Sequence, residues 1–108
     1  MTYRFMRILV FFDLPTTTDK DKREYRRFRK TLIKNGFVMM QESVYTRMVI
    51  NKTVEKSVVD MLKRNKPAEG LVQAIVITEK QFSGMVNISG EFVSSVNPEG
   101  SKTIILNT

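Results

Sequence analysis

The chain has no cysteine and no histidine among its 108 residues. Without cysteine there is no disulfide, no thiolate nucleophile and no cysteine-bound zinc, and without histidine there is no imidazole to act as acid, base or metal ligand. Any catalysis therefore has to use carboxylates, hydroxyls, cations or a hard metal ion such as Mg²⁺. The lack of cysteine also suits the reducing conditions of the cytoplasm.

Long apolar runs are missing as well. No stretch approaches the ~20 apolar residues that a membrane helix needs. Arg4 and Arg7 interrupt the apolar start before the core of a signal peptide can form. We therefore expect a cytoplasmic protein that does not associate with membranes, and its length suits one compact core and not two.

Negative charge is scarce. The chain carries 18 Lys and Arg residues against 11 Asp and Glu residues, for a net charge of +7. A surplus of this size favours polyanionic partners, because each contact with a phosphate releases counterions. Nucleic acid is the leading candidate, and the alternative is a basic protein with no such partner.

The order of apolar patterns predicts the fold. Residues 3–12 form an almost continuous apolar run, typical of a central strand buried on both faces. A helix follows from Thr18 or Asp19 to about Asn35, with Gly36 as its stop, and then come strands at 37–40 and 44–50. A second helix begins near Asn51 or Thr53 and is closed by Pro67 and Gly70, and a strand follows at 71–78. This β-α-β-β-α-β order predicts an α+β ferredoxin-like domain over residues 1–82.

Two helices can cover only one face of such a sheet. Phe11, Met40, Met48 and similar side chains are too numerous for that face, so we expect a homodimer that pairs the bare sheet faces. Residues 83–108 form a C-terminal extension with short strands. Its last apolar segment (Thr103, Ile104, Ile105, Leu106) is a candidate strand for docking on the sister copy or on another protein, and the alternative is a loose tail.

Asp13 is the most informative acidic residue, since it ends the predicted central strand just before Pro15. One carboxylate is a poor Mg²⁺ site, but a two-fold axis near Asp13 would add a second carboxylate, and Mg²⁺ keeps much of its own water. Such an ion could activate water for phosphodiester cleavage. The alternative is a structural role for Asp13 in a turn.

One face of the first helix is strongly basic, opposite the apolar stripe that contains Phe28 and Leu32. Its cations are Arg23, Arg26, Arg27, Lys30 and Lys34. Such a surface suits contacts to backbone phosphates and carries no base recognition. The alternative is an ordinary solvated helix face.

Short motifs in a fixed order resemble the CRISPR-associated Cas-two (Cas2) family, and most closely the variant that accompanies single-effector, RNA-guided systems. They are YRFMR at 3–7, FDLP at 12–15, YRRFRK at 25–30, GF at 36–37, SVY at 43–45 and TEKQF at 78–82. The resemblance implies a homodimer held between dimers of the Cas-one (Cas1) integrase, binding double-stranded DNA during spacer acquisition. It also implies that Asp13 corresponds to the metal-binding aspartate of a metal-dependent nuclease.

Three other functions stay open. The first is a Mg²⁺-dependent endonuclease that acts on RNA or DNA through paired Asp13 carboxylates. The second is a free-standing, toxin-like ribonuclease with the same metal site. The third is an RNA-binding module with the same order of strands and helices, but residues 44–50 lack the aromatic pattern that such a module carries on its third strand.

Overall fold

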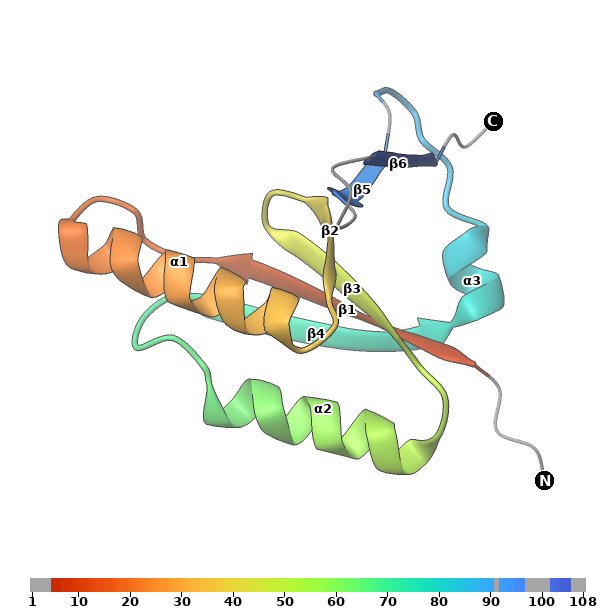
Figure 1. Cartoon of the computed structure of the whole chain (residues 1–108), viewed down its shortest axis with the longest axis horizontal. Coiled ribbons are helices and arrows are strands. Elements are labelled where there is room, and N and C mark those ends of the chain that lie inside the picture. The colour runs from red at the N-terminus through yellow and green to blue at the C-terminus, as the bar shows by residue number, and fades with distance from the viewer. Residues whose placement is uncertain (1–4, 91, 97–101, 106–108) are drawn as a thin grey trace.

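The computed structural model describes residues 5–90, 92–96 and 102–105 (Figure 1). The elements of the main domain are β1 (Met6–Asp13), α1 (Asp19–Lys34), β2 (Val38–Gln41), β3 (Val44–Val49), α2 (Lys52–Arg64) and β4 (Leu71–Thr78). They are followed by α3 (Glu79–Ser83), β5 (Phe92–Val96) and β6 (Lys102–Ile105). The predicted α+β order from β1 to β4 is confirmed, with most boundaries displaced by one residue or less.

The main sheet is antiparallel, with the strand order β2-β3-β1-β4. β1 lies in the centre, as its apolar run predicts, so that Val10 pairs with Tyr45 of β3 on one side and Ala74 of β4 on the other. The short link between β2 and β3 makes them neighbours, and the register shifts between Met39 and Gln41. This is the antiparallel ferredoxin-like sheet that the sequence predicts.

Both long helices begin, and α1 also ends, at the residues that the sequence indicates. The hydroxyl of Thr18 accepts a hydrogen bond from the Asp21 amide, and the Asp21 carboxylate accepts one from the Thr18 amide, which forms a capping box at the start of α1. Asn51 caps α2 through the Val54 amide. Gly36 ends α1 at φ +89°, a left-handed conformation that favours glycine.

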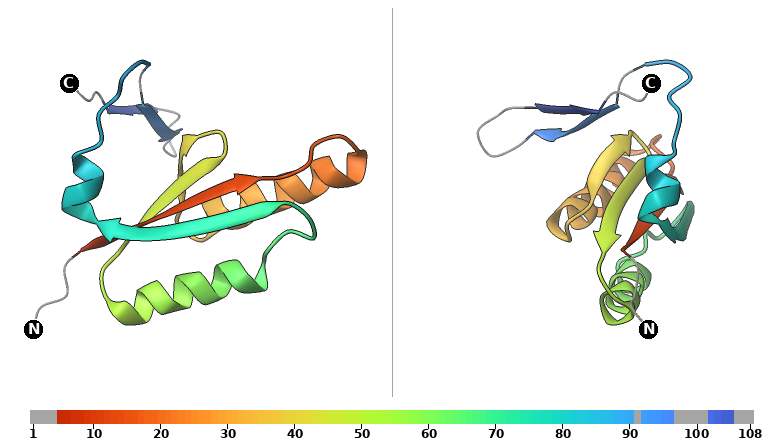
Figure 2. Two further views of the ribbon diagram at one scale, coloured as in Figure 1. Left: turned by 180° about the vertical axis from the view of Figure 1, so that it is seen from behind. Right: turned by 90° about the vertical axis from the view of Figure 1, so that its right-hand side faces the viewer.

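The core lies between the sheet and the two long helices, which cover the same face (Figure 2). Ile8, Val10 and Phe12 point from β1 into this layer, where Phe28 of α1 is fully buried. The rings of Phe12 and Phe28 meet edge to face with centroids 5.3 Å apart. Edge-to-face packing places the positive edge of one ring against the negative face of the other and therefore stabilises this centre.

The opposite face of the sheet is partly bare. Side chains alternate along a strand, so Phe11 points away from the helices, and it is 40% exposed. Other exposed apolar residues of this open face are Met48, Leu71 and Ile75. The expectation that β1 is buried on both faces is therefore only partly correct for a single chain, because Leu9 is buried on this face while Phe11 stays 40% exposed. Dimerisation through this face stays a prediction.

The chain after β4 contains more structure than the sequence pattern indicated. The short helix α3 was not predicted; Thr78 and Gln81 form a capping box at its start. The segment at 103–106 is not an isolated strand, because β6 pairs antiparallel with β5. Among the described residues, none of the helices is both long and apolar enough to cross a membrane.

Candidate carboxylate site and nucleic-acid interface

Asp13 is the last residue of β1, as its position before Pro15 suggested, and the structure shows that it is exposed. It pairs in register with Leu71 of β4 and lies at a shallow depression of about 230 Å³. The lining consists of Phe11, Phe12, Asp13, Ser43, Val44, Leu71 and Gln73. The carboxylate therefore stands at the edge of the bare apolar face, where a second copy would approach.

The backbone around Asp13 is fixed from two sides. The Phe12 amide donates a hydrogen bond to the Ser43 carbonyl over 3.1 Å, which joins the end of β1 to the β2–β3 turn. On the other side is Gly70, whose φ is +97°; a Cβ atom added there would lie 2.6 Å from the carbonyl oxygen of Asp13. Only glycine permits this close approach, so the α2–β4 loop helps to set the position of Asp13.

The donor chemistry at Asp13 fits a hard metal ion only in part. A carboxylate oxygen is a ligand that Mg²⁺ prefers, and two residues with neutral side-chain oxygens, Ser43 and Gln73, line the same depression. Yet the described residues contain no group of three or more Asp, Glu, His or Cys side chains placed to share a metal ion. A Mg²⁺ ion at Asp13 would need further ligands from a second copy, from substrate or from water.

The basic face of α1 is exposed along its length. Arg23, Arg26, Lys30 and Lys34 are all exposed, and among residues 5–90 none of them has an acidic partner within ion-pair distance. We call these four residues the α1 cation surface. Their charges are available to an anionic ligand, as the sequence pattern suggested.

Arg27 differs from the other predicted contact residues. Its guanidinium forms two hydrogen bonds with the Glu24 carboxylate, of 3.1 and 2.9 Å, and also donates to the Asn65 carbonyl. The hydrogen bond from Arg27 lowers the pKa of Glu24 below its ordinary value. Arg27 therefore ties α1 to the α2–β4 loop, and Glu24 offsets its charge.

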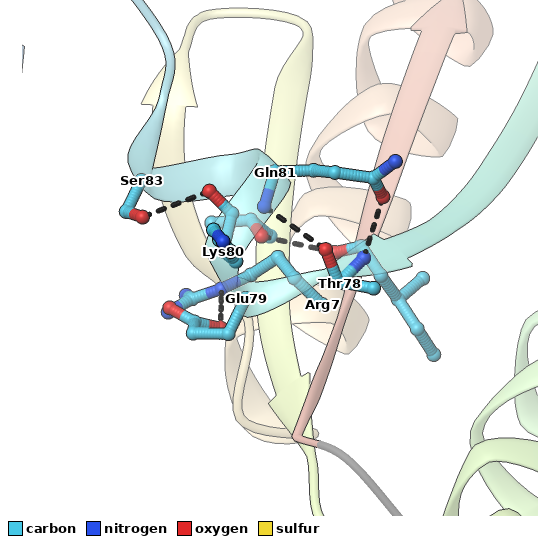
Figure 3. Close-up of polar contacts among 8 residues, drawn as sticks. Arg7, Thr78, Glu79, Lys80, Gln81 and Ser83 are labelled. Carbon is cyan, nitrogen blue, oxygen red and sulfur yellow. Dashed lines mark hydrogen bonds and ion pairs between the residues drawn. The ribbon is translucent and has the colours of Figure 1, made fainter.

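Contacts of Arg7 with two residues of α3 join this helix to the sheet, and no sequence pattern indicated them (Figure 3). Arg7 of β1 forms a two-point ion pair with Glu79, in which the Nε–Oε2 distance is 3.0 Å. Its guanidinium carbon also lies 4.3 Å from the centre of the Phe82 ring. Because Arg7 points to the open face, these contacts hold α3 against one end of that face.

Comparison with known proteins places the chain in a family. A profile of the family described as "CRISPR associated protein Cas2" matches residues 6–85. The chain belongs to the Cas2 family. One relative, from Treponema denticola, is 48% identical over 103 residues, which is 95% of this chain and 93% of the relative. Another, from Ligilactobacillus salivarius, is 40% identical over 101 residues, 94% of this chain and 100% of the relative.

Both of these Cas2 relatives carry the name "CRISPR-associated endoribonuclease Cas2", as does one from Streptococcus mutans that is 37% identical over 101 residues. The predicted resemblance is therefore confirmed. The family match contains Asp13, all of α1 and the Arg7–Glu79 pair, and it ends before β5. Of the predicted docking residues, Thr103, Ile104 and Ile105 lie at the end of β6, while Leu106 lies outside the described residues.

Proposed function

We propose that this Cas2 chain is a DNA-binding subunit of the complex that acquires CRISPR spacers, in which it bridges dimers of the Cas1 integrase. The observation that carries the proposal is the α1 cation surface, because four exposed cations lie there without a carboxylate partner in the described chain. Contacts of this kind bind the backbone of a duplex and do not read its bases.

Pairing of two open sheet faces is the second part of the proposal. Leu71 and Ile75 are more than half exposed in one chain, and Phe11 lies between them and the β2–β3 turn. Burial of such side chains stabilises a dimer by about 25 cal/mol for each Å² of apolar surface removed from water. A dimer of this form would carry two Asp13 carboxylates and two α1 cation surfaces, which suits a long duplex.

The β5–β6 hairpin is the proposed docking element for Cas1. Strands that pair only with each other leave an edge to which another chain can add. An Ile104→Asp substitution should therefore weaken the association of the two purified proteins, and the homodimer should persist. Loss of the homodimer in the same variant would assign β6 to the sister copy instead.

The DNA-binding part of the proposal is tested by charge changes on α1. Arg23→Gln with Lys30→Gln should weaken duplex binding and reduce its dependence on salt, by about 0.9 in the log–log slope for each phosphate that the protein no longer binds. Lys63→Gln, which removes one exposed cation of α2 away from this surface, is the matched control. Equal slopes for the wild type and the double variant would remove α1 from the DNA-binding surface.

A second candidate function is a Mg²⁺-dependent endonuclease, which the names of the relatives and the position of Asp13 favour. Asp13 from two copies would hold the ion, and a bound Mg²⁺ lowers the pKa of its water and stabilises phosphate charge. The chain itself would contribute the carboxylates and, through Gly70, their fixed backbone position.

Asp13→Asn separates the two functions, because it removes the charge and keeps the shape. The bridging function predicts that the variant still supports spacer integration when it is mixed with Cas1 and duplex DNA. The nuclease function predicts loss of Mg²⁺-dependent cleavage of single-stranded RNA, with Asp60→Asn on α2 as a control that retains it. Loss of integration by a variant that is still dimeric would contradict a purely bridging role.

A further inference from the structure

Arg29 is held in one orientation by a buried tyrosine. Its Nε donates a hydrogen bond of 2.9 Å to the hydroxyl of Tyr45, a residue with no exposed surface. The Tyr45 ring lies in the core, 5.6 Å from the ring of Phe12. Because a ring packed in this way cannot turn freely, its hydroxyl is a rigid acceptor for the guanidinium.

The neutral acceptor leaves the charge of Arg29 intact. Arg7 and Arg27 are oriented by the carboxylates of Glu79 and Glu24, which offset their charges. Tyr45 is a neutral phenol, and burial raises its pKa above the ordinary value, although the hydrogen bond from Arg29 opposes this rise. Arg29 therefore combines a fixed orientation with a full positive charge.

The rest of the guanidinium borders an open depression. Within residues 5–90 only the Nε of Arg29 is hydrogen-bonded, so both terminal nitrogens are available. Arg29 lines a depression of about 330 Å³, together with Tyr25, Met39 and Glu42. The Tyr25 hydroxyl donates to the Glu42 carbonyl over 3.2 Å, which fixes the β2–β3 turn as the far wall.

We propose that Arg29 is the oriented phosphate contact of this protein, with Tyr45 as its positioning residue and the two terminal nitrogens binding one phosphate of a DNA duplex. This inference rests on the proposed DNA binding and adds a site at the edge of the α1 cation surface. Arg26 precedes Arg29 by three residues on α1, about one helical turn, so the two side chains are neighbours on the helix surface and one DNA backbone can pass from Arg26 to Arg29.

Substitution of Glu42 tests whether a phosphate binds beside Arg29. It lines the same depression, and its negative charge opposes a bound phosphate. Glu42→Gln should therefore strengthen duplex binding by about two- to fivefold at low salt, since removing one like charge near a phosphate lowers the repulsion. A weaker or unchanged affinity would contradict a phosphate at this position.

Two variants separate charge from orientation, measured with a fluorescently labelled duplex over a range of salt concentrations. Arg29→Gln should reduce the log–log salt slope by about 0.9 for each copy that binds the duplex. Tyr45→Phe keeps the charge and the core ring, so the slope should stay the same while the affinity falls about three- to tenfold, because Arg29 must then be ordered on binding. Lys63→Gln, an exposed cation on α2, is the control.

Wild-type affinity in Tyr45→Phe, or a wild-type slope in Arg29→Gln, would overturn the inference. An equal loss of affinity in Lys63→Gln would also overturn it, by showing a general charge effect. A loss confined to a single-stranded probe would assign the site to unpaired strands and overturn the duplex assignment. If the wild-type protein bound no duplex at all, the proposed function itself would fail. If the wild-type protein bound the duplex and the Arg29 and Tyr45 variants bound it equally well, DNA binding by the α1 cation surface would still hold and only the Arg29 site would be excluded.

Discussion

Replacement of Gly70 by alanine should be the most damaging of three glycine substitutions, because it combines two separate costs. Gly70 has φ +97°, where a Cβ atom destabilises the backbone by about 1–2 kcal/mol. The added Cβ would also lie 2.6 Å from the Asp13 carbonyl oxygen and 3.0 Å from the Leu14 Cα, both backbone atoms that cannot rotate away. Overpacking of this kind costs about a further 1–3 kcal/mol.

Two other glycines in the described part of the chain, Gly36 and Gly90, are also left-handed and separate these costs. Gly90 has φ +83° and nothing within 4 Å of an added Cβ, so its alanine variant carries the conformational cost alone. Gly36 has φ +89°, and its nearest neighbour is the Arg47 side chain at 3.4 Å, which can move. We expect the order Gly90→Ala, then Gly36→Ala, then Gly70→Ala, with a total loss of about 2–5 kcal/mol for Gly70→Ala.

The assay is urea unfolding followed by circular dichroism, at one protein concentration for all variants, because dimerisation makes stability depend on concentration. Gly70→Ala should also disturb the candidate carboxylate site, since relief of the close approach moves the backbone of Asp13. A Gly70→Ala protein no less stable than Gly36→Ala would refute the reasoning, and would show that the α2–β4 loop relaxes without strain.

Three further predictions concern the open face, the Arg7 cluster and Tyr45. Ile75→Lys should make the protein monomeric in analytical ultracentrifugation, whereas Ile33→Lys on α1, at the same 51% exposure, should leave the oligomeric state unchanged; a shared outcome would exclude the open face as the interface. Glu79→Ala should lower the free energy of unfolding by about 1–3 kcal/mol and speed hydrogen exchange in α3, because it leaves the half-buried Arg7 guanidinium unpaired. Unchanged exchange would show that the Arg7–Glu79 pair does not hold α3 in place. The pKa of Tyr45 is raised in the folded protein, so the folded protein holds the phenol proton more tightly than the unfolded chain does, and this difference stabilises the fold fully below pH 10.0 and less as the pH rises above it. The stability of Tyr45→Phe should therefore depend less on pH in that range. Identical stability profiles for Tyr45→Phe and the wild type would count against the burial effect.

Local patterns were sufficient to predict most of the elements. The Thr18 cap, the Gly36 stop and the spacing of Phe28 and Leu32 define α1 through interactions within a few residues. The β-branched run at 71–78 defines β4 in the same way. Such signals depend on near neighbours in the chain, which is why the sequence carries them directly.

The C-terminal region shows where local patterns were insufficient. α3 has only five residues, too few for a helical repeat to be recognised, although Thr78 and Gln81 do form a capping signal. Pairing of β5 with β6 depends on interactions across a connection, and the segment at 103–106 does not by itself reveal its partner strand.

The amino-acid sequence by itself determined the order of the elements, the position of Asp13 at the end of a central strand, the basic face of α1 and membership of the Cas2 family. The Glu24–Arg27 pair is a local contact between residues three apart on α1, but only the tertiary structure decided that Arg7 meets the Glu79 carboxylate and that Arg29 meets the neutral phenol of Tyr45. The reason is that a charged side chain is available or neutralised according to what folding places within about 4 Å of it, and those partners can lie far away along the chain.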